Sequence, residues 1–487
     1  MESYALRVLS AFRSQLHACF SKRADALFEL TDSILTAGPQ PSPVHLSLEP
    51  VHRRGWGSLY AALSEGYIHV DRLRTLLVQH APDPLVAVGS SRDADKCGSR
   101  RVFGVDVSVW SRCDAEASPD RGFYYHPSRH SAGQPIVAGW AYQWIAQLGF
   151  TRDSWTAPLD VRRVHPNENV HVVAVKQIRQ LLGSLDPERR EPDTDQEATS
   201  LTLRPLFVFD AGYDPVQLAE ELANSSMAVS LSILVRLRSG RCFYGDPLSP
   251  VECGTGRGTA GGRPRRHGRK FECSNPVTWP TPTLEHQCQD AQYGTVRVRA
   301  WCGLHPKTQN HPTHGTRQPR PISKGTLVLV EVSRLPRKTR EPQVLWLWYS
   351  GPDADEPDLD LLDILWRSYI RRFDLEHTFR FLKQTLNWTV PRVRLPEQAD
   401  RWTWLVVTAY TQLRLARSCV IDQRLPWERP LEAGKLTPYR VRRRFWTLLL
   451  EVGTPAKVPK PCGRSPGRPK GRLSGPARRY PAIKKAA

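Results

Sequence analysis

The chain has 487 residues, a length that suits about two to four domains with sizeable cores. Lys and Arg number 69 against 48 Asp and Glu, so the formal net charge is +21, which predicts attraction to a polyanion such as nucleic acid rather than a merely soluble basic protein. The first residues lack the basic and apolar regions of a secretory signal, and the uncharged stretch 131–151 contains Pro and Gln, so the sequence disfavours secretion and membrane insertion and predicts a cytoplasmic protein.

Residues 1–90 are predicted to form a helical N-terminal domain. Their second half, "GWGSLYAALSEGYIHVDRLRTLLVQHA", fits two short helices separated by a turn at Gly66. Such a pair is typical either of a helix-turn-helix that binds DNA ends or of a small helical bundle. Because nothing in the sequence indicates base contacts, we expect the bundle.

Residues 95–239 alternate strands and helices, which predicts a mixed α/β sheet. The run "RVFGVDVSVW" carries one acid, Asp106, and "GFYYHP" and "PIVAGWAYQWIAQLGF" resemble the strands that follow it. A helix is expected over "NENVHVVAVKQIRQLLGSL". The segment "RPLFVFDAGYDPVQLAEELA" begins as a buried strand that ends at Asp210 and continues as a helix opened by Pro215, with Asp214 as its N-cap.

Residues 240–352 are expected to form a mainly β insertion into this α/β domain, because strands such as "GTVRVRAWCG", "GTLVLVEVSR" and "QVLWLWYSG" are separated by Pro- and Gly-rich spacers. The basic run "GGRPRRHGRK" lies within it and is a candidate for DNA contact. Helix returns after Pro357, and residues 353–450 are expected to form the second part of the α/β domain, including the helix that carries Glu376. Residues 451–487 are predicted to be a disordered basic tail, since no acid occurs from Lys457 onward.

Within this tail, "SPGRPKGR" resembles an AT-hook, a Gly-Arg-Pro core flanked by cations. An extended Arg-Pro segment can lie in the narrow minor groove of A·T tracts, where the negative potential is enhanced. Arg468, Lys470 and Arg472 are therefore predicted to bind DNA, either by reading A·T tracts or by contacting phosphates without sequence preference.

The 10 cysteines are scattered without a CxxC pair, which is typical of reduced thiols in an intracellular protein. An alternative is a zinc site formed by Cys253, Cys273, Cys288 and Cys302 with His305, although the spacings are irregular.

The stretch "YIRRFDLEHTFRFLK" is predicted to be a helix with polar groups along one face. Tyr369, Arg372, Glu376 and Lys383 recur at helical spacing, so at about 100° per residue they share a face. Phe379 lies on the same face and is expected to anchor the helix to the core.

Two further acids, Asp106 and Asp210, occur within or at the end of apolar strands, where a buried carboxylate needs a cation, a donor or a metal. Together with Glu376 they could hold two Mg²⁺ ions, which prefer oxygen ligands. Paired ions of this kind activate the attacking oxygen and stabilise the leaving oxygen of a phosphodiester.

The cations on the helix face suit the same chemistry. Arg372 and Lys383 would bind phosphates on either side of the scissile bond, and Tyr369 would donate a hydrogen bond. The alternative is that Glu376 is only an ion-pair partner of Arg372 or Lys383, which would leave the two strand acids unexplained.

The spacing of Tyr, Arg, Glu and Lys in this helix is the signature of a large group of bacterial insertion-sequence transposases. With "GVDVSVW" and "FVFDAGYD" as the two aspartate strands, residues 95–400 resemble a DDE transposase of this Y-R-E-K group. The resemblance implies an RNase H-like catalytic domain interrupted by the β insertion, with Asp106, Asp210 and Glu376 as catalytic metal ligands.

The same resemblance implies an activity, a cofactor and partners. The protein would bind terminal inverted repeats, cleave with Mg²⁺ (or Mn²⁺) and transfer the freed 3′-hydroxyl to target DNA, as a homodimer on DNA in the bacterial nucleoid. In similar proteins an aromatic from the insertion stacks on a flipped base; Trp301, Trp346 and Trp348 are candidates, although core packing is the expected role for most of them. The alternatives are a non-catalytic or domesticated DNA-binding protein and a stand-alone RNase H-like nuclease.

Overall fold

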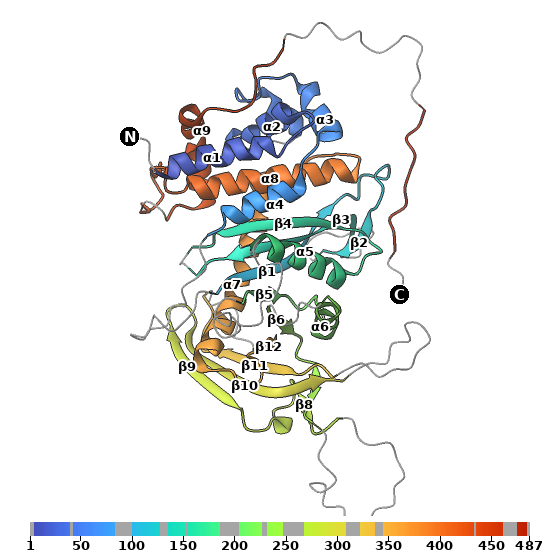
Figure 1. Ribbon diagram of the computed structural model, residues 1–487, viewed down its shortest axis with the longest axis vertical. Coiled ribbons are helices and arrows are strands. Elements are labelled where there is room, and N and C mark those ends of the chain that lie inside the picture. Colours follow the sequence, from blue (N-terminus) through green and yellow to red (C-terminus); the bar gives the residue numbers. More distant parts are fainter. Residues whose placement is uncertain are drawn as a thin grey trace, which may run out of the picture.

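Figure 1 shows a computed structural model of the chain. It describes residues 4–38, 42–82, 100–126, 135–150, 153–185, 204–225, 231–246, 267–307, 322–336, 344–432, 435–460 and 475–484.

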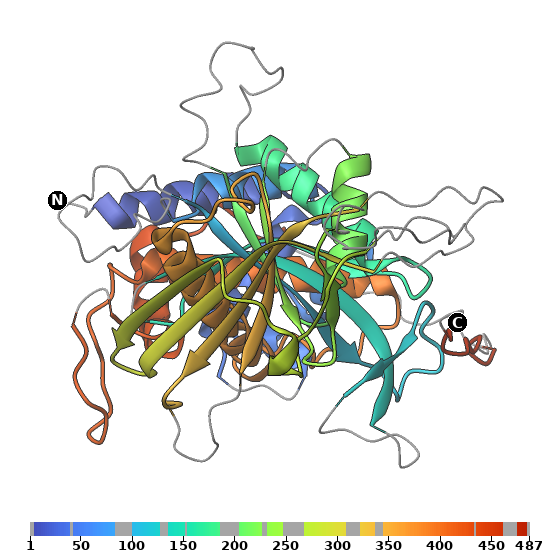
Figure 2. The ribbon, with the colours of Figure 1, turned by 90° about the horizontal axis from the view of Figure 1, so that it is seen from below.

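The centre of the described part is a mixed 12-stranded sheet with the order β2-β3-β1-β5-β6-β12-β11-β10-β7-β8, in which β4 also pairs with β3 and β9 with β10. Figure 2 shows how strongly the sheet twists from one edge to the other. The strands are β1 (Val102–Ser111), β2 (Gly122–Tyr125), β3 (Ile136–Leu148), β4 (Thr156–Val164), β5 (Leu206–Phe209), β6 (Ser232–Leu237), β7 (Cys242–Tyr244), β8 (Lys270–Glu272), β9 (Leu284–Asp290), β10 (Gly294–Pro306), β11 (Gly325–Val332) and β12 (Leu345–Ser350).

Helices form a layer on one side of the sheet and flank its middle (Figure 1). The layer contains the first helices of the chain together with α8 and α9, while α5 and α6 lie beside the central strands. The helices are α1 (Tyr4–Ala18), α2 (Ala24–Thr36), α3 (Trp56–Glu65), α4 (Val70–Gln79), α5 (Val170–Leu185), α6 (Pro215–Asn224), α7 (Leu359–Gln384), α8 (Pro396–Ala416) and α9 (Pro438–Val452), with short 3₁₀ helices at Pro43–Leu48 and Pro276–Thr278.

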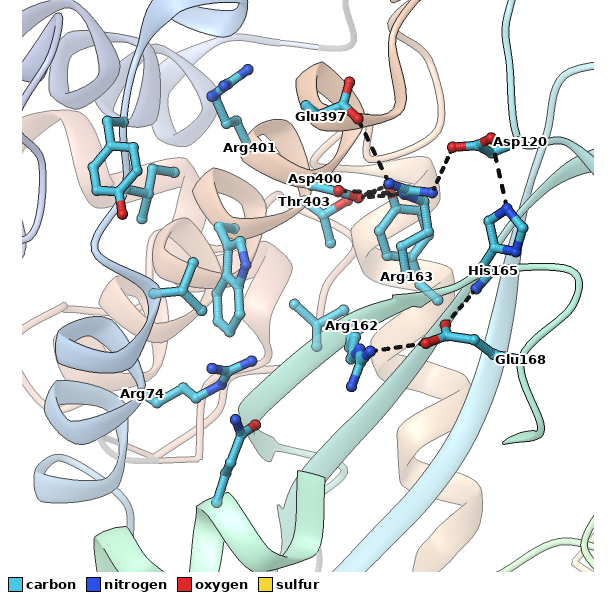
Figure 3. A pocket seen from close by; sticks show the side chains of 17 residues that line it. Arg74, Asp120, Arg162, Arg163, His165, Glu168, Glu397, Asp400, Arg401 and Thr403 are labelled. Atoms are coloured by element: carbon cyan, nitrogen blue, oxygen red, sulfur yellow. Dashed lines mark hydrogen bonds and ion pairs between the residues drawn. The ribbon is translucent and has the colours of Figure 1, made fainter. Parts of the chain in front are cut away.

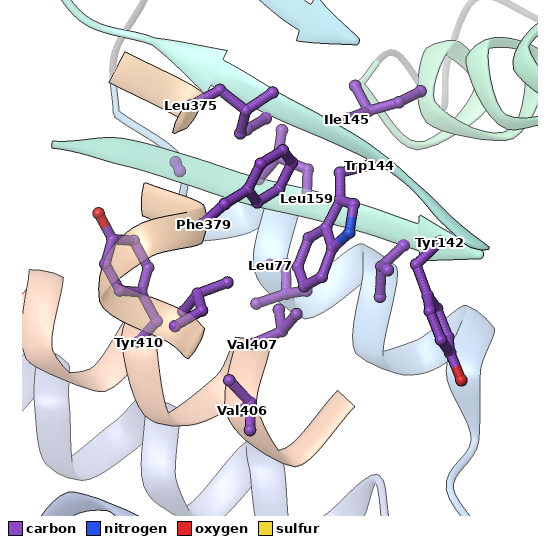
Figure 4. Packing of buried hydrophobic residues seen from close by; sticks show 14 of the residues in the cluster. Leu77, Tyr142, Trp144, Ile145, Leu159, Leu375, Phe379, Val406, Val407 and Tyr410 are labelled. Carbon is purple, nitrogen blue, oxygen red and sulfur yellow. The ribbon is translucent and has the colours of Figure 1, made fainter. Parts of the chain in front are cut away.

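One hydrophobic core joins the helical layer to the sheet. Leu77 of α4, Trp144 of β3, Phe379 of α7 and Val407 of α8 belong to it and are all buried (Figure 4). Helix α8 is buried on nearly every side, since the N-terminal helices and the sheet cover it at once. The N-terminal helices therefore share a core with segments from the other end of the chain.

Strands β1, β5 and β6 run parallel and are aligned at the level of the strand acids. One row of paired residues consists of Val105, Phe209 and Val235. The next residues along the three strands are Asp106, Asp210 and Arg236, so the pairing places these side chains in neighbouring positions. Burial of β5 on both faces explains why its run "LFVF" is entirely apolar.

Several local predictions are confirmed. The run "PIVAGWAYQWIAQLGF" forms the expected strand as β3, and the helix expected over "NENVHVVAVKQIRQLLGSL" forms α5. Asp214 is the N-cap of α6, because its carboxylate accepts hydrogen bonds from the amides of Val216 and Gln217 at 3.0 and 3.2 Å. Strand β4 was not predicted, since its sequence "TAPLDVRRV" interrupts the apolar pattern with proline and charges.

The strands of the expected insertion continue the central sheet. Strand β12 pairs with β6 on one side and with β11 on the other, so residues 240–352 add strands to the α/β sheet through a continuous hydrogen-bond ladder. The division of the chain into five domains stays a prediction.

The disordered tail stays a prediction, and the structure describes residues 451–460 and 475–484 of this segment. The first segment continues from α9 and packs on the core through Ala456, which is 6% exposed. In the second, the amide of Ile483 donates to the carbonyl of Arg121 at 2.6 Å, because the edge of β2 offers unpaired backbone groups. No helix in the described ranges has both the length and the apolar character needed to cross a membrane.

Candidate active site

The strand acids occupy different positions on the sheet. Asp106 lies within β1, where its side chain is 19% exposed and its Oδ1 accepts a hydrogen bond from the Val107 amide at 2.7 Å. Asp210 directly follows β5 and is 37% exposed, because the strand ends there. One carboxylate is therefore nearly buried, and the other faces solvent.

Helix α7 brings the third acid to the sheet. The helix starts at its N-cap Asp358, whose carboxylate accepts from the Leu361 amide at 2.7 Å. Farther along, Phe379 packs against Trp144 with the ring centroids 5.5 Å apart, which confirms its expected anchoring role (Figure 4). This packing holds the helix so that Glu376, one turn earlier, faces the strand acids.

The guanidinium of Arg372 lies between the three acids. Its Nη1 is 2.8 Å from Asp106 Oδ2, and its Nη2 is 3.2 Å from Glu376 Oε1 and 3.7 Å from Asp210 Oδ1. The arginine side chain is 2% exposed, so water screens the attraction between its guanidinium and the carboxylates only weakly. The phenol of Tyr369 also donates to Asp210 Oδ1 at 3.5 Å.

Burial and neighbouring charges change the protonation behaviour of this cluster. Burial raises the pKa of Asp106 to about 6, the guanidinium of Arg372 lowers it, and the charges of Asp210 and Glu376 raise it. Burial alone would lower the pKa of Arg372, but the neighbouring acids raise it above its ordinary value. Burial also raises the pKa of the Tyr369 phenol. The arginine therefore stays charged, while Asp106 titrates near neutrality.

The donor set fits hard divalent cations. Three carboxylates supply only oxygen ligands, and the 37% and 53% exposure of Asp210 and Glu376 leaves space for water and phosphate. However, Arg372 separates the acids, which are not among the described groups whose potential ligand atoms all lie within 4.8 Å of one another. A divalent ion can take the place between the acids only after the guanidinium moves or the carboxylates turn.

The other predicted DNA-binding residue of the helix, Lys383, lies two turns beyond Glu376. Its Nζ is 5.6 Å from the centroid of the Trp388 ring, and its contact with DNA stays a prediction. The AT-hook residues Arg468, Lys470 and Arg472 lie outside the described residues.

Two residues at the acid cluster were missed by the sequence analysis. Arg236 of β6 is 45% exposed, and its Nη1 is 3.6 Å from Asp210 Oδ1. Phe373 of α7 is 39% exposed, and its ring lies beside Arg372, whose Cζ is 5.0 Å from the ring centroid. A signal for Arg236 existed, because a single arginine interrupts the otherwise apolar strand "SILVRL".

The tryptophans considered for base stacking are part of the core. Trp301, Trp346 and Trp348 are only 1–2% exposed, and Trp301 and Trp346 pack against each other. In this conformation none of their rings can reach a DNA base, so core packing is confirmed.

The zinc set considered from the sequence does not come together in the described part of the chain. Cys288 pairs with Val296 across β9 and β10, whereas Cys302 lies six residues farther along β10, roughly 20 Å away at strand spacing. Cys253 lies outside the described residues.

A cavity of about 610 Å³ lies between α4, β4 and α8, and the three acids are not among its lining residues (Figure 3). Two of its arginines face carboxylates: Arg163 pairs with Asp400 at 3.1 Å and with Asp120 at 3.5 Å, and Arg162 pairs with Glu168 at 3.0 Å. The Arg163–Asp400 pair ties β4 to α8, and the three pairs balance charge along the cavity wall.

Comparison with known proteins identifies the family. A family model described as DDE superfamily endonuclease matches residues 15–307, a range that includes Asp106 and Asp210 and ends before Glu376. A search of curated proteins gave no match. Because the family model covers more than half of the chain, this protein belongs to the DDE superfamily endonucleases, which typically use divalent metals to cut DNA.

Proposed function

We propose that this chain is a DDE transposase of the Y-R-E-K group, with an RNase H-like catalytic core, that cleaves the ends of an insertion sequence and joins them to target DNA. The observation that carries the proposal is the convergence of Asp106, Asp210 and Glu376 on Arg372. A plain ion pair needs one acid. Even with Arg236 beside Asp210, three carboxylates exceed the two guanidinium groups next to them, and divalent cations can neutralise the remaining negative charge.

The three acids would hold two Mg²⁺ ions, or Mn²⁺ in their place. When bound, such ions activate the attacking oxygen and stabilise the leaving oxygen of a phosphodiester. Asp106 has to be deprotonated to act as a ligand, and burial raises its pKa to about 6, so activity should fall when the pH drops below that value.

Residues around the acids would position the DNA. Arg236 offers an exposed guanidinium next to Asp210, where it can bind a phosphate beside the scissile bond through paired hydrogen bonds. Arg372 is 2% exposed, so it could bind a phosphate only after its guanidinium leaves the three acids. Tyr369 orients the Asp210 carboxylate through its hydroxyl. The exposed ring of Phe373 supplies an apolar surface beside the acid cluster, and a base can stack on it.

The reaction would proceed in two displacements at phosphorus. In the first, a water oxygen bonds to phosphorus and the bond to the 3′ oxygen breaks, which yields a 3′-hydroxyl and a 5′-phosphate. In the second, the freed 3′-hydroxyl attacks a target phosphodiester, so one bond forms as another breaks and no outside energy source is required. Two copies of the chain would hold the two terminal inverted repeats.

The test uses the purified full-length chain, Mg²⁺ and a DNA fragment carrying the sequences that flank its gene. Asp106→Asn, Asp210→Asn and Glu376→Gln should each abolish cleavage and retain DNA binding. Asp360→Asn, which changes an exposed acid on the same helix, serves as the matched control and should cleave normally.

Two outcomes would contradict the proposal. Cleavage that survives in the three variants would show that these acids are not catalytic, and loss of DNA binding in all of them would assign them to the fold. Supplying precut ends separates the remaining alternatives, since a transposase joins such ends to target DNA and a stand-alone nuclease does not.

A further inference from the structure

A second cluster of potential metal ligands lies where α7 crosses the edge of the sheet. His286 and Cys288 are two residues apart on β9, so their side chains leave the strand on the same face. Asp363 approaches from the second turn of α7, which lies beside β9 (Figure 1). One ligand atom from each residue lies within 4.8 Å of the other two.

The carboxylate of Asp363 is held in a fixed orientation. Its Oδ1 accepts a hydrogen bond from Trp366 Nε1 at 2.9 Å, and its Oδ2 accepts one from Arg367 Nε at 2.7 Å. Oδ1 thereby faces the strand, 3.6 Å from His286 Nε2 and 3.9 Å from Cys288 Sγ. Outer partners of this kind orient the ligands of many metal sites.

The imidazole of His286 faces the same point, with its Nε2 at ion-pair distance from Asp363 Oδ1. Its Nε2 is buried and has no hydrogen-bond partner. Here the unsatisfied atom points at the carboxylate and the thiol, which is where a shared cation would lie.

We propose that His286, Cys288 and Asp363 bind one Zn²⁺ ion, with water at the fourth position. Ligand atoms around tetrahedral zinc are roughly 3.4 Å apart, given bonds of about 2.0–2.3 Å, so the observed separations of 3.6 and 3.9 Å need only small adjustments. The thiol of Cys288 releases its proton to solvent when the metal binds, and the histidine stays neutral. One thiolate and one carboxylate then balance the charge of the ion.

The ligand types separate this site from the acid cluster around Arg372. A thiolate and an imidazole favour zinc, whereas three carboxylates favour magnesium or manganese. This set also differs from the one considered from the sequence, because Cys288 joins a histidine two residues away and an aspartate from a distant helix rather than other cysteines.

The position of the site indicates a structural role. The ion would link β9 to the beginning of α7, the helix that carries Arg372 and Glu376 farther along. It would thereby fix the helix against the sheet at one end, while the packing of Phe379 against Trp144 fixes the other. A catalytic benefit from holding Arg372 and Glu376 in place rests on the proposed function, but zinc binding itself does not.

The experiment titrates the metal-free full-length protein with Co²⁺, whose thiolate complexes show a sulfur-to-metal charge-transfer band. We expect one equivalent of Co²⁺ to produce this band and Zn²⁺ to displace it. Cys288→Ser should remove the band, whereas Cys302→Ser, which changes a half-buried cysteine on the neighbouring strand, should keep it. His286→Gln should weaken Zn²⁺ binding by more than the roughly 10–100-fold cost of changing an outer-shell partner.

An Asp106→Asn variant makes failure of this proposal distinguishable from failure of the proposed function. It should lose cleavage and retain the charge-transfer band. A wild-type protein without the band, or a band that persists in Cys288→Ser, would overturn the zinc site whatever the result of the cleavage assay. If Cys288→Ser does not fold, alkylation of the thiol in the wild-type protein replaces it, and a band that survives alkylation overturns the site equally.

Discussion

Replacing Arg372 by methionine should destabilise the metal-free protein and strengthen its response to divalent cations. The guanidinium contacts all three acids, so its removal leaves Asp106, Asp210 and Glu376 to repel one another. Methionine keeps most of the aliphatic volume, and therefore the loss reports the charge rather than a cavity.

The magnitude follows from how deeply each contact is buried. The pair with Asp106 joins side chains that are 2% and 19% exposed at 2.8 Å, and removing one partner of such a buried pair costs about 3–5 kcal/mol. Asp210 and Glu376 are 37% and 53% exposed, so solvent screens their contributions, which should be under about 1 kcal/mol each. We expect Arg372→Met to lose about 3 kcal/mol of unfolding free energy, the lower end of the range for breaking a buried pair.

Urea unfolding at increasing Mg²⁺ or Mn²⁺ concentration measures both effects. Arg372→Met should regain more unfolding free energy than the wild type at every metal concentration, because the guanidinium no longer competes for the carboxylates. Arg380→Met, an exposed arginine on the same helix, should behave like the wild type. A loss below about 1 kcal/mol, or equal metal-dependent gains in variant and wild type, would refute the competition.

Two further predictions concern pH and DNA. The pKa of Asp106 is about 6 in the folded chain, against an ordinary value of 3.8. Protonation of Asp106 therefore stabilises the fold fully below pH 3.8, and this stabilisation disappears as the pH rises through 6. The difference between the two pKa values corresponds to about 3 kcal/mol of unfolding free energy. Asp106→Asn should therefore gain stability over the wild type as the pH rises across that window in metal-free buffer, and a pH-independent difference in unfolding free energy would contradict the burial argument. Arg236→Ala should weaken DNA binding and reduce the slope of log K against log salt by about 1. The control is Arg241→Ala, which changes a similarly exposed arginine that pairs with Asp214. It should change neither the affinity nor the slope, because the DNA backbone contacts the acid cluster and not Arg241.

Local patterns in the sequence were sufficient for the elements that carry the acids. Apolar β-branched runs predicted the strands at Asp106 and Asp210, and helical spacing placed Arg372 and Glu376 on one face. Both patterns depend on the period of side chains along one element, which is a property of neighbouring residues. The same holds for the N-cap at Asp214, since capping involves only the next few amides.

Only the tertiary structure decided which residues meet across elements. Arg236 reaches Asp210 because β6 pairs with β5 in parallel register. Cys288 meets Asp363 because α7 lies beside β9. The docking of Ile483 on the edge of β2 is equally non-local. Hydrogen-bond ladders between strands are largely indifferent to side-chain identity, so a sequence determines its strands locally, but their order and register depend on the packing of the whole core.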